Sequence, residues 1–189
     1  MNWEKRMIDT DTSLPRDYID KKGRKIIIRP YEEKDFPRLK EMYDVFEPKG
    51  LEAGLPPIEN HVRKQWLHSV TKSFYSILAL YRGKVIGHAG LDLSAPNQCP
   101  EYLIFIKQGY RDAGIGTAMS EIMRQLAETT GCPKVWLTVR SANTRAIRVF
   151  EKVSFRFRGV IDIQREMELI IKKKPSQNKK TRSSSKLTL

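Results

Sequence analysis

The sequence is short of the features that mark several large classes of protein. It has two cysteines, Cys99 and Cys132, in 189 residues, so we expect neither a disulfide framework nor a cysteine-based metal cluster. Three scattered histidines, His61, His68 and His88, add no ligand spacing, and no metal site is predicted. No apolar run approaches the ~20 residues that a membrane helix needs. These absences favour a reducing, cytoplasmic protein without a membrane partner.

The N-terminal residues also lack the apolar centre of a secretory signal. At 40% hydrophobic and 30% charged residues, the composition is that of a globular protein, and the length fits one domain. We therefore expect an N-terminal extension over residues 1–22, a single domain over 23–171 and a tail over 172–189.

Charge is distributed unevenly along the sequence. The formal net charge is +13, but residues 172–189 hold seven Lys or Arg and no acidic residue, which leaves the first 171 residues at +6. This tail has few apolar residues and is predicted to be disordered. A solubilising role is favoured over an arm for an acidic partner, and nucleic acid is not the expected partner.

Alternating β-prone and helical patterns predict a mixed α/β (α+β) domain. Strands are predicted over residues 24–29, 74–81, 85–93, 101–106 and 134–139, with two more within 155–171. Helices are predicted over residues 33–46, 61–71, 115–130 and 143–153. This order favours a central mixed, mostly antiparallel sheet of six to seven strands with four helices. A parallel pair is expected between 101–106 and 134–139, because a helix crosses from one to the other.

A glycine-containing stretch, residues 108–127, is the most informative motif. It places Gly114 and Gly116 between a predicted strand and a predicted helix. Unpaired N–H groups and the dipole at a helix start favour an anion, so a phosphate-bearing ligand is expected. The full dinucleotide fingerprint is excluded because its third glycine is replaced by Met119, and no Gly-Lys-Ser or Gly-Lys-Thr of a Walker loop is present.

Residues 111–116 (RDAGIG) fit the pattern [Gln/Arg]-x-x-Gly-x-[Gly/Ala], which resembles the signature loop of the GNAT superfamily of acyl-CoA-dependent N-acyltransferases. The predicted element order is similar to that of the same family over residues 25–171. Residues 143–155 also resemble a later family segment, N-x-x-A-x-x-x-Y-E-K-x-G-F. The resemblance implies a GNAT fold, and it extends loosely to bacterial protein-lysine acetyltransferase domains.

By this resemblance, the protein would be an N-acetyltransferase that moves an acetyl group from acetyl-CoA directly to a primary amine. Coenzyme A would bind the backbone around the glycine loop, and its pantetheine arm would follow the preceding strand. The residues implied at the cofactor are Phe105, Ile106, Arg111, Asp112, Ala113, Gly114, Ile115, Gly116, Thr117, Asn143 and Phe150.

Acetyl transfer needs a neutral amine, a polarised carbonyl and a proton for the leaving thiolate. Members of the family often use a carboxylate on the strand before the loop as base, which here implies Glu101, with Asp92 and His88 in reserve. A backbone N–H near Phe105 or Ile106 would polarise the carbonyl. Glu101 as an ordinary charged residue at a strand end is the competing interpretation.

The sequence departs from the family pattern at two positions. Phe150 replaces the tyrosine that many members use as general acid, and Ser154 replaces a glycine. A thiol with a pKa of about 8.5 can leave without that acid. The missing tyrosine nevertheless motivates an alternative function, a non-catalytic acyl-CoA-binding sensor. Cys99 as a covalent acyl carrier is a further alternative, but no matched histidine supports it.

The acceptor is the least defined part of the prediction. In the family it contacts the connection between the first two helices and the last hairpin, here residues 47–59 and 159–166. The first segment holds two glycines and three prolines and is expected to form a loop. A moderately positive domain gives no attraction for polyamines or aminoglycosides. A protein lysine, a protein N-terminus and a small amine therefore stay open, as does a homodimer.

Overall fold

The computed structural model describes residues 14–50, 54–94 and 99–171. The predicted tail over 172–189 and the first 13 residues of the predicted N-terminal extension lie outside the described residues. The strands are β1 (Arg16–Ile19), β2 (Lys25–Pro30), β3 (Phe74–Tyr81), β4 (Lys84–Asp92), β5 (Tyr102–Ile106), β6 (Lys134–Arg140), β7 (Arg156–Arg158) and β8 (Gln164–Ile170). A short 3-10 turn, η1 (Glu33–Asp35), precedes the helices α2 (Phe36–Asp44), α3 (Asn60–Ser73), α4 (Ile115–Thr130) and α5 (Thr144–Lys152).

The strands form two antiparallel sheets. The larger has five strands in the order β1-β2-β3-β4-β5, and the smaller has three in the order β6-β8-β7. Strand β3 illustrates why the larger sheet carries helices on both faces: Ile77 and Ala79 join one buried cluster, whereas Leu78 and Leu80 join another. An alternating strand with both faces buried requires cover on each side.

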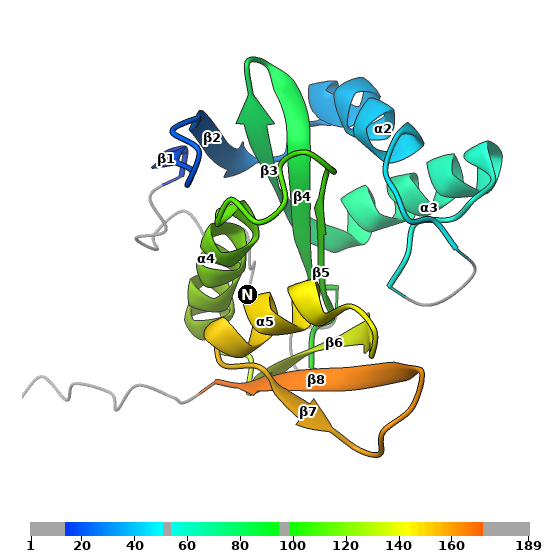
Figure 1. Cartoon of the computed structure of the whole chain (residues 1–189), viewed down its shortest axis with the longest axis vertical. Coiled ribbons are helices and arrows are strands. Elements are labelled where there is room, and N and C mark those ends of the chain that lie inside the picture. The colour runs from blue at the N-terminus through cyan, green and yellow to red at the C-terminus, as the bar shows by residue number, and fades with distance from the viewer. Residues whose placement is uncertain (1–13, 51–53, 95–98, 172–189) are drawn as a thin grey trace, which may run out of the picture.

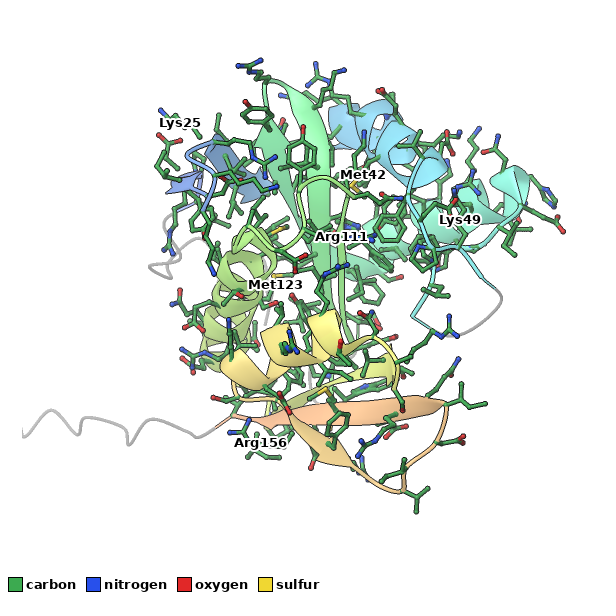
Figure 2. The ribbon with its side chains drawn as sticks, in the orientation of Figure 1. Lys25, Met42, Lys49, Arg111, Met123 and Arg156 are labelled. Carbon is green, nitrogen blue, oxygen red and sulfur yellow. The ribbon has the colours of Figure 1, made fainter. Side chains whose placement is uncertain are left out.

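Helix α4 covers one face of the larger sheet, and α2 and α3 cover the other (Figure 1). Met123 of α4 belongs to the first cluster and Met42 of α2 to the second, and the two side chains are labelled in Figure 2. Helix α5 packs on α4 and adds Phe150 to the first cluster. The first cluster therefore also joins the two sheets.

The two sheets meet at one parallel bridge, between Glu101 and Trp136. The Trp136 N–H donates to Pro100 O at 3.1 Å next to it. The parallel pair expected between β5 and β6 is thus limited to this bridge, and the two strands separate beyond it. Further along β6, Gly54 rather than β5 approaches the strand, because a Cβ at Gly54 would lie 3.0 Å from Thr138 O. We call this opening between the sheets the seam.

The mixed α/β fold with four helices is confirmed, and each predicted strand and helix is present with shifts of a few residues at its ends. One strand was not predicted. β1 lies inside the predicted extension 1–22 and pairs with β2 over four residues. Its sequence, Arg-Asp-Tyr-Ile, is too short and too charged to show a clear alternation. The turn at Gly23 therefore connects two strands of the sheet, and does not separate an extension from the domain.

Candidate functional site

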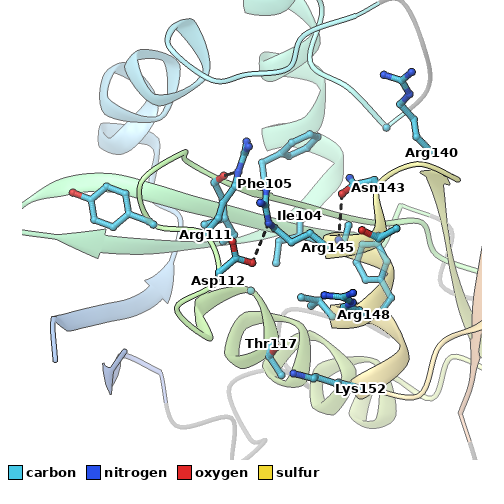
Figure 3. Close-up of a pocket in the computed structure, with 18 of the residues that line it drawn as sticks. Ile104, Phe105, Arg111, Asp112, Thr117, Arg140, Asn143, Arg145, Arg148 and Lys152 are labelled. Carbon is cyan, nitrogen blue, oxygen red and sulfur yellow. Dashed lines mark hydrogen bonds and ion pairs between the residues drawn. The ribbon is translucent and has the colours of Figure 1, made fainter. Parts of the chain in front are cut away.

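A cavity of about 810 Å³ opens at the seam, between β5, the start of α4, and α5 (Figure 3). Nine of the residues expected at the cofactor line it: Phe105, Ile106, Arg111, Asp112, Gly114, Gly116, Thr117, Asn143 and Phe150. Ala113 and Ile115 do not; their side chains are 1% and 0% exposed and pack in the first cluster. Their side chains therefore hold the loop to the core and do not face the cavity.

The glycine loop ends in a left-handed residue that begins α4. Gly114 is the N-cap of this helix with φ of +86°, a value that L-residues with side chains seldom adopt. A Cβ at Gly114 would also lie 2.4 Å from the Tyr18 hydroxyl oxygen. Glycine is required here for both reasons. The N–H groups of the first turn that follows have no side-chain cap, and such groups bind anions.

Positive charge surrounds this helix start. Among the residues that the structure describes, the cavity is lined by one acidic residue, Asp112, and by six basic residues: Lys21, Arg111, Arg140, Arg145, Arg148 and Lys152. Arg145 Nε pairs with Asp112 Oδ1 at 3.0 Å, and both side chains are largely exposed. Arg148 and Lys152 follow at helical spacing on α5 (Figure 3). The site therefore fits a ligand with several negative charges.

Arg111 is engaged by the protein itself. Its Nε donates to Ile106 O at 2.8 Å, its Nη2 donates to Glu47 O, and its guanidinium lies 5.0 Å from the centre of the Phe46 ring. Burial lowers the pKa of Arg111, and Arg145 nearby adds to this effect. Arg111, which the resemblance places at the cofactor, thus also links the glycine loop to the α2–α3 connection.

The register of β5 decides which of its backbone groups face the seam. Asp92 N–H donates to Glu101 O and Lys107 N–H donates to Ile86 O, both at 2.9 Å. Since hydrogen-bonded pairs alternate in an antiparallel ladder, Phe105 directs its backbone to His88 on β4. Of the two positions expected to offer a backbone N–H to the carbonyl, Phe105 is therefore excluded, and it lines the cavity with its side chain instead. The backbone groups of Ile104 and Ile106 face the seam.

Asn143 has a local structural role. Its Oδ1 accepts a hydrogen bond from the Ala146 N–H at 3.2 Å and so caps the start of α5. This cap fixes the end of α5 that borders the cavity. Asn143 also lines the cavity, so the same residue can shape the site through the helix it begins.

Phe150 is 6% exposed and its ring lies edge-on to Tyr102, with centroids 6.2 Å apart. The Tyr102 hydroxyl is bonded to Ser120 Oγ at 2.8 Å, and burial raises the Tyr102 pKa. Tyr102 does not line the cavity. It is therefore no substitute for the tyrosine that the family pattern places at Phe150. Ser154, the second departure, has φ of +76°, which explains why the pattern carries glycine there.

Glu101 is partly buried at the start of β5 and is absent from the residues that line the cavity. Burial raises its pKa, and the negative charge of Asp92, opposite it on β4, raises it further. The lining ends at Ile104, three residues along the strand. Glu101 thus lies just before the first residue of β5, three residues from the point where the strand stops lining the cavity.

His88, one of the reserve candidates, is enclosed in the second core. It is 0% exposed, and burial lowers its pKa to about 3. Its Nδ1 lies 2.7 Å from the Tyr43 hydroxyl and its Nε2 lies 3.0 Å from Ser76 Oγ. Ser76 Oγ donates to Phe74 O at 3.4 Å, so it accepts from Nε2–H, and Nδ1 accepts from Tyr43. A neutral imidazole with both nitrogens engaged does not serve as a base for the cavity.

The α2–α3 connection contributes Pro48, Gly54 and Leu55 to the cavity, whereas no residue of 159–166 lines it. Cys99 is also outside the lining, and its carbonyl oxygen accepts the Trp136 indole N–H at 2.9 Å. The described residues contain no group of three metal-binding side chains. No helix within those same ranges is long and apolar enough to cross a membrane.

Several lining residues were not identified from the sequence. Arg145, Arg148 and Lys152 recur at positions i, i+3 and i+7 of a predicted helix, and this spacing alone places them on one face. Lys21 carried no such signal, because it comes from the unpredicted hairpin of β1 and β2. Ile104 follows from the period of two along β5 once the pairing with β4 is known.

Comparison with known proteins agrees with this geometry. The sequence matches the acetyltransferase (GNAT) family over residues 36–155. It is 30% identical over 67 residues to the spermine/spermidine N(1)-acetyltransferase of Bacillus subtilis, a match that spans 35% of this chain and 44% of that relative. The match therefore spans less than half the length of that relative.

Two solved structures share the fold. The GNAT domain of S. lividans PAT superposes with a TM-score of 0.71 at 18% identity, covering 82% of this chain and 96% of that one. The yncA protein of Salmonella typhimurium, solved with its cofactor acetyl-CoA, superposes with a TM-score of 0.62 at 15% identity, covering 80% of this chain and 96% of that one. At these identities the similarity establishes the architecture.

Proposed function

Because the chain belongs to the acetyltransferase (GNAT) family and is thus an acyl-CoA-dependent transferase, we propose that it carries an acetyl group from acetyl-CoA directly to a primary amine. The observation that supports this most is the cavity at the seam. It combines a helix start with free N–H groups, six basic side chains and a strand edge that leads inward.

The charges of the cavity orient the donor along it. Its diphosphate accepts hydrogen bonds from the N–H groups of residues 112–117 at the start of α4, where glycine allows close approach. Arg145, Arg148 and Lys152 on α5 supply positive charge for the remaining phosphate. The pantetheine amides pair with the backbone of Ile104 and Ile106, whose groups face the seam. The thioester then points along β5 toward Glu101.

The chemistry is a single displacement. The lone pair of the neutral amine attacks the thioester carbonyl carbon, a C–N bond forms, and the C–S bond breaks. A backbone N–H of β5 that faces the seam stabilises the negative charge on the carbonyl oxygen. The nitrogen then loses one proton to water, and coenzyme A leaves as a thiolate, which is stable enough near neutral pH to need no acid at Phe150.

Glu101 is the proposed base, acting on the incoming ammonium directly or through water. Its raised pKa brings it closer to neutral pH, which suits a base that must take up a proton. We expect Glu101→Gln to lower kcat by at least about 10²-fold while the affinity for acetyl-CoA is unchanged. Asp92→Asn is the matched control, with a smaller effect through the pKa of Glu101. Equal kcat in wild type and Glu101→Gln would remove Glu101 from the mechanism.

The acceptor is proposed as a primary amine without a further assignment. The similarity to a polyamine acetyltransferase covers less than half of that protein, and the cavity lining is basic, whereas a polyamine calls for acidic side chains. Free-thiol release from acetyl-CoA is to be followed with spermidine, lysine peptides and peptides with a free N-terminus, and each product weighed by mass spectrometry. Release with any of these amines supports the transferase. Tight coenzyme A binding with no release across the panel would favour the sensor.

A further inference from the structure

The hairpin of β1 and β2 touches the glycine loop although it lies outside residues 36–155, which match the family. The Lys21 N–H at its tip donates to Ala113 O at 3.1 Å. Arg24 Nη1 donates to Gly109 O at 3.2 Å, and its guanidinium lies 4.5 Å from the centre of the Tyr110 ring. The tip is thus fastened to both ends of the loop that approaches the proposed diphosphate.

The tip itself is internally fixed. Asp20 is 3% exposed, and its carboxylate accepts the N–H groups of Lys22 and Arg24, both at 2.9 Å, and the Arg24 Nε at 2.7 Å. These bonds lower the pKa of Asp20 although its burial acts in the opposite direction. Gly23 closes the turn with φ of +73°. The backbone of Lys21 is therefore held in one place relative to the glycine loop.

The Lys21 side chain points along this loop into the cavity. Its Cε lies 3.8 Å from the position that a Cβ on Gly114 would take, and Lys21 lines the cavity. Within the described parts of the chain, Lys21 makes no ion pair and no side-chain hydrogen bond. Arg111, the signature basic residue, is by contrast bonded to two backbone carbonyls.

We propose that Lys21 binds the diphosphate of the acyl-CoA donor, so that the hairpin of β1 and β2 is part of the donor site. This inference rests on the proposed function. The ammonium supplies the mobile positive charge that Arg111 does not, from the side of the loop opposite α5. A flexible lysine is suited to this role because it acts on phosphate as a point charge.

The test is calorimetric binding of coenzyme A and of dephospho-coenzyme A, which lacks the 3′-phosphate, to wild type, Lys21→Ala, Lys21→Arg and Lys22→Ala. Lys22 is the control because it is adjacent, equally basic and exposed, and does not line the cavity. We expect Lys21→Ala to weaken both ligands by about five- to tenfold, as for one charge-assisted contact. Lys21→Arg and Lys22→Ala should stay within about twofold of wild type.

The outcomes separate the two proposals. If Lys21→Ala binds both ligands as Lys22→Ala does, the Lys21 assignment is wrong while the donor site stands. If Lys21→Ala loses affinity for coenzyme A alone, Lys21 contacts the 3′-phosphate and the diphosphate assignment is wrong. If wild type binds neither ligand, the proposed function itself fails. Melting temperatures of the four proteins, expected to agree, check that a loss is not one of folding.

Discussion

The space around Gly114 decides which residue the glycine loop can carry there. A Cβ built on Gly114 would lie 2.4 Å from the Tyr18 hydroxyl oxygen and 3.6 Å from Tyr18 Cζ, because the hairpin of β1 and β2 brings Tyr18 against the loop. At Gly116 the nearest atom would be Ile106 Cγ1 at 3.7 Å, which is ordinary contact. The two glycines of the motif therefore meet different requirements, and only the first is excluded from carrying a methyl group.

We expect Gly114→Ala to weaken coenzyme A binding by about tenfold or more, since strain at such a position costs about 1–3 kcal/mol. Gly116→Ala is the matched control and should bind within a few-fold of wild type. Adding Tyr18→Phe removes the clashing oxygen and should restore part of the affinity of Gly114→Ala. Titration calorimetry measures all four proteins. If the affinity for coenzyme A does not recover in the double variant, the positive φ at Gly114, and not the contact with Tyr18, causes the loss.

The buried imidazole of His88 makes stability depend on pH. The unfolded chain binds a proton at His88 near pH 6.5 and the folded protein only near pH 3. Between these values the unfolded state holds more protons, so the free energy of unfolding falls as pH falls, by up to about 1.4 kcal/mol per unit. Above about pH 7 this contribution is constant.

Denaturant unfolding of wild type and His88→Gln at several pH values between 7 and 4.5 measures the contribution of His88 to the pH dependence of the free energy of unfolding. The variant should be less stable at pH 7 but should lose the extra slope. Taking the difference also removes the contribution of Glu101, whose raised pKa acts in the opposite direction. His61→Gln, at an exposed position, should keep the wild-type slope. Parallel curves for wild type and His88→Gln would contradict the neutral, buried state.

At the scale of elements, Arg111 joins the glycine loop to the connection between α2 and α3. Its guanidinium bonds the end of β5 and the carbonyl of Glu47, and Gln108 Nε2 donates to Val45 O at 3.3 Å beside it. The α2–α3 connection lines the cavity through Pro48, Gly54 and Leu55. One side chain thus joins the glycine loop to the segment expected to meet the acceptor.

Arg111→Lys keeps the charge but cannot bond both carbonyls with a planar fork. We expect faster amide hydrogen exchange over residues 44–50 in this variant and a higher KM for the acceptor. Affinity for coenzyme A should change by less than about threefold, since the Arg111 guanidinium is occupied by two backbone carbonyls and the substitution keeps the positive charge. Arg145→Lys serves as control, with unaltered exchange over 44–50. A large loss of coenzyme A affinity with unchanged exchange would show that Arg111 serves phosphate instead.

The elements themselves were largely predictable, because long strands such as β3 and helices such as α4 carry clear periodicity. Strand β1 was missed because four residues show too little pattern. The position of Lys21 at the cavity was missed for the same reason, since Lys21 lies in the turn that follows β1. The parallel pair of β5 and β6 was overestimated, since the crossover rule gives direction but not how far two strands stay together. The engagement of Arg111 and the direction of the Phe105 backbone depend on register and tertiary contacts, which no single sequence displays.

At the scale of the whole molecule, charge is organised around one opening. The first 171 residues carry a net charge of only +6, yet the described lining of the cavity holds six basic side chains and one acidic one. Raising NaCl from about 50 to 500 mM shortens the screening length roughly threefold. Coenzyme A affinity should then fall by about tenfold, whereas binding of uncharged pantetheine should not. Equal salt dependence of both ligands would place the phosphates away from these cations.

The seam also bears on how long the protein survives. Within the described ranges, the larger sheet and the smaller one share one β-bridge, at Glu101 and Trp136, so side-chain packing in the first cluster holds them together more than backbone hydrogen bonds do. A donor molecule bound at the seam would contact both sheets and would stabilise their association while it is bound. At a concentration one hundred times its Kd, such a ligand adds about 2.7 kcal/mol to the free energy of unfolding. The lifetime of the folded enzyme would then follow the supply of its own acetyl donor.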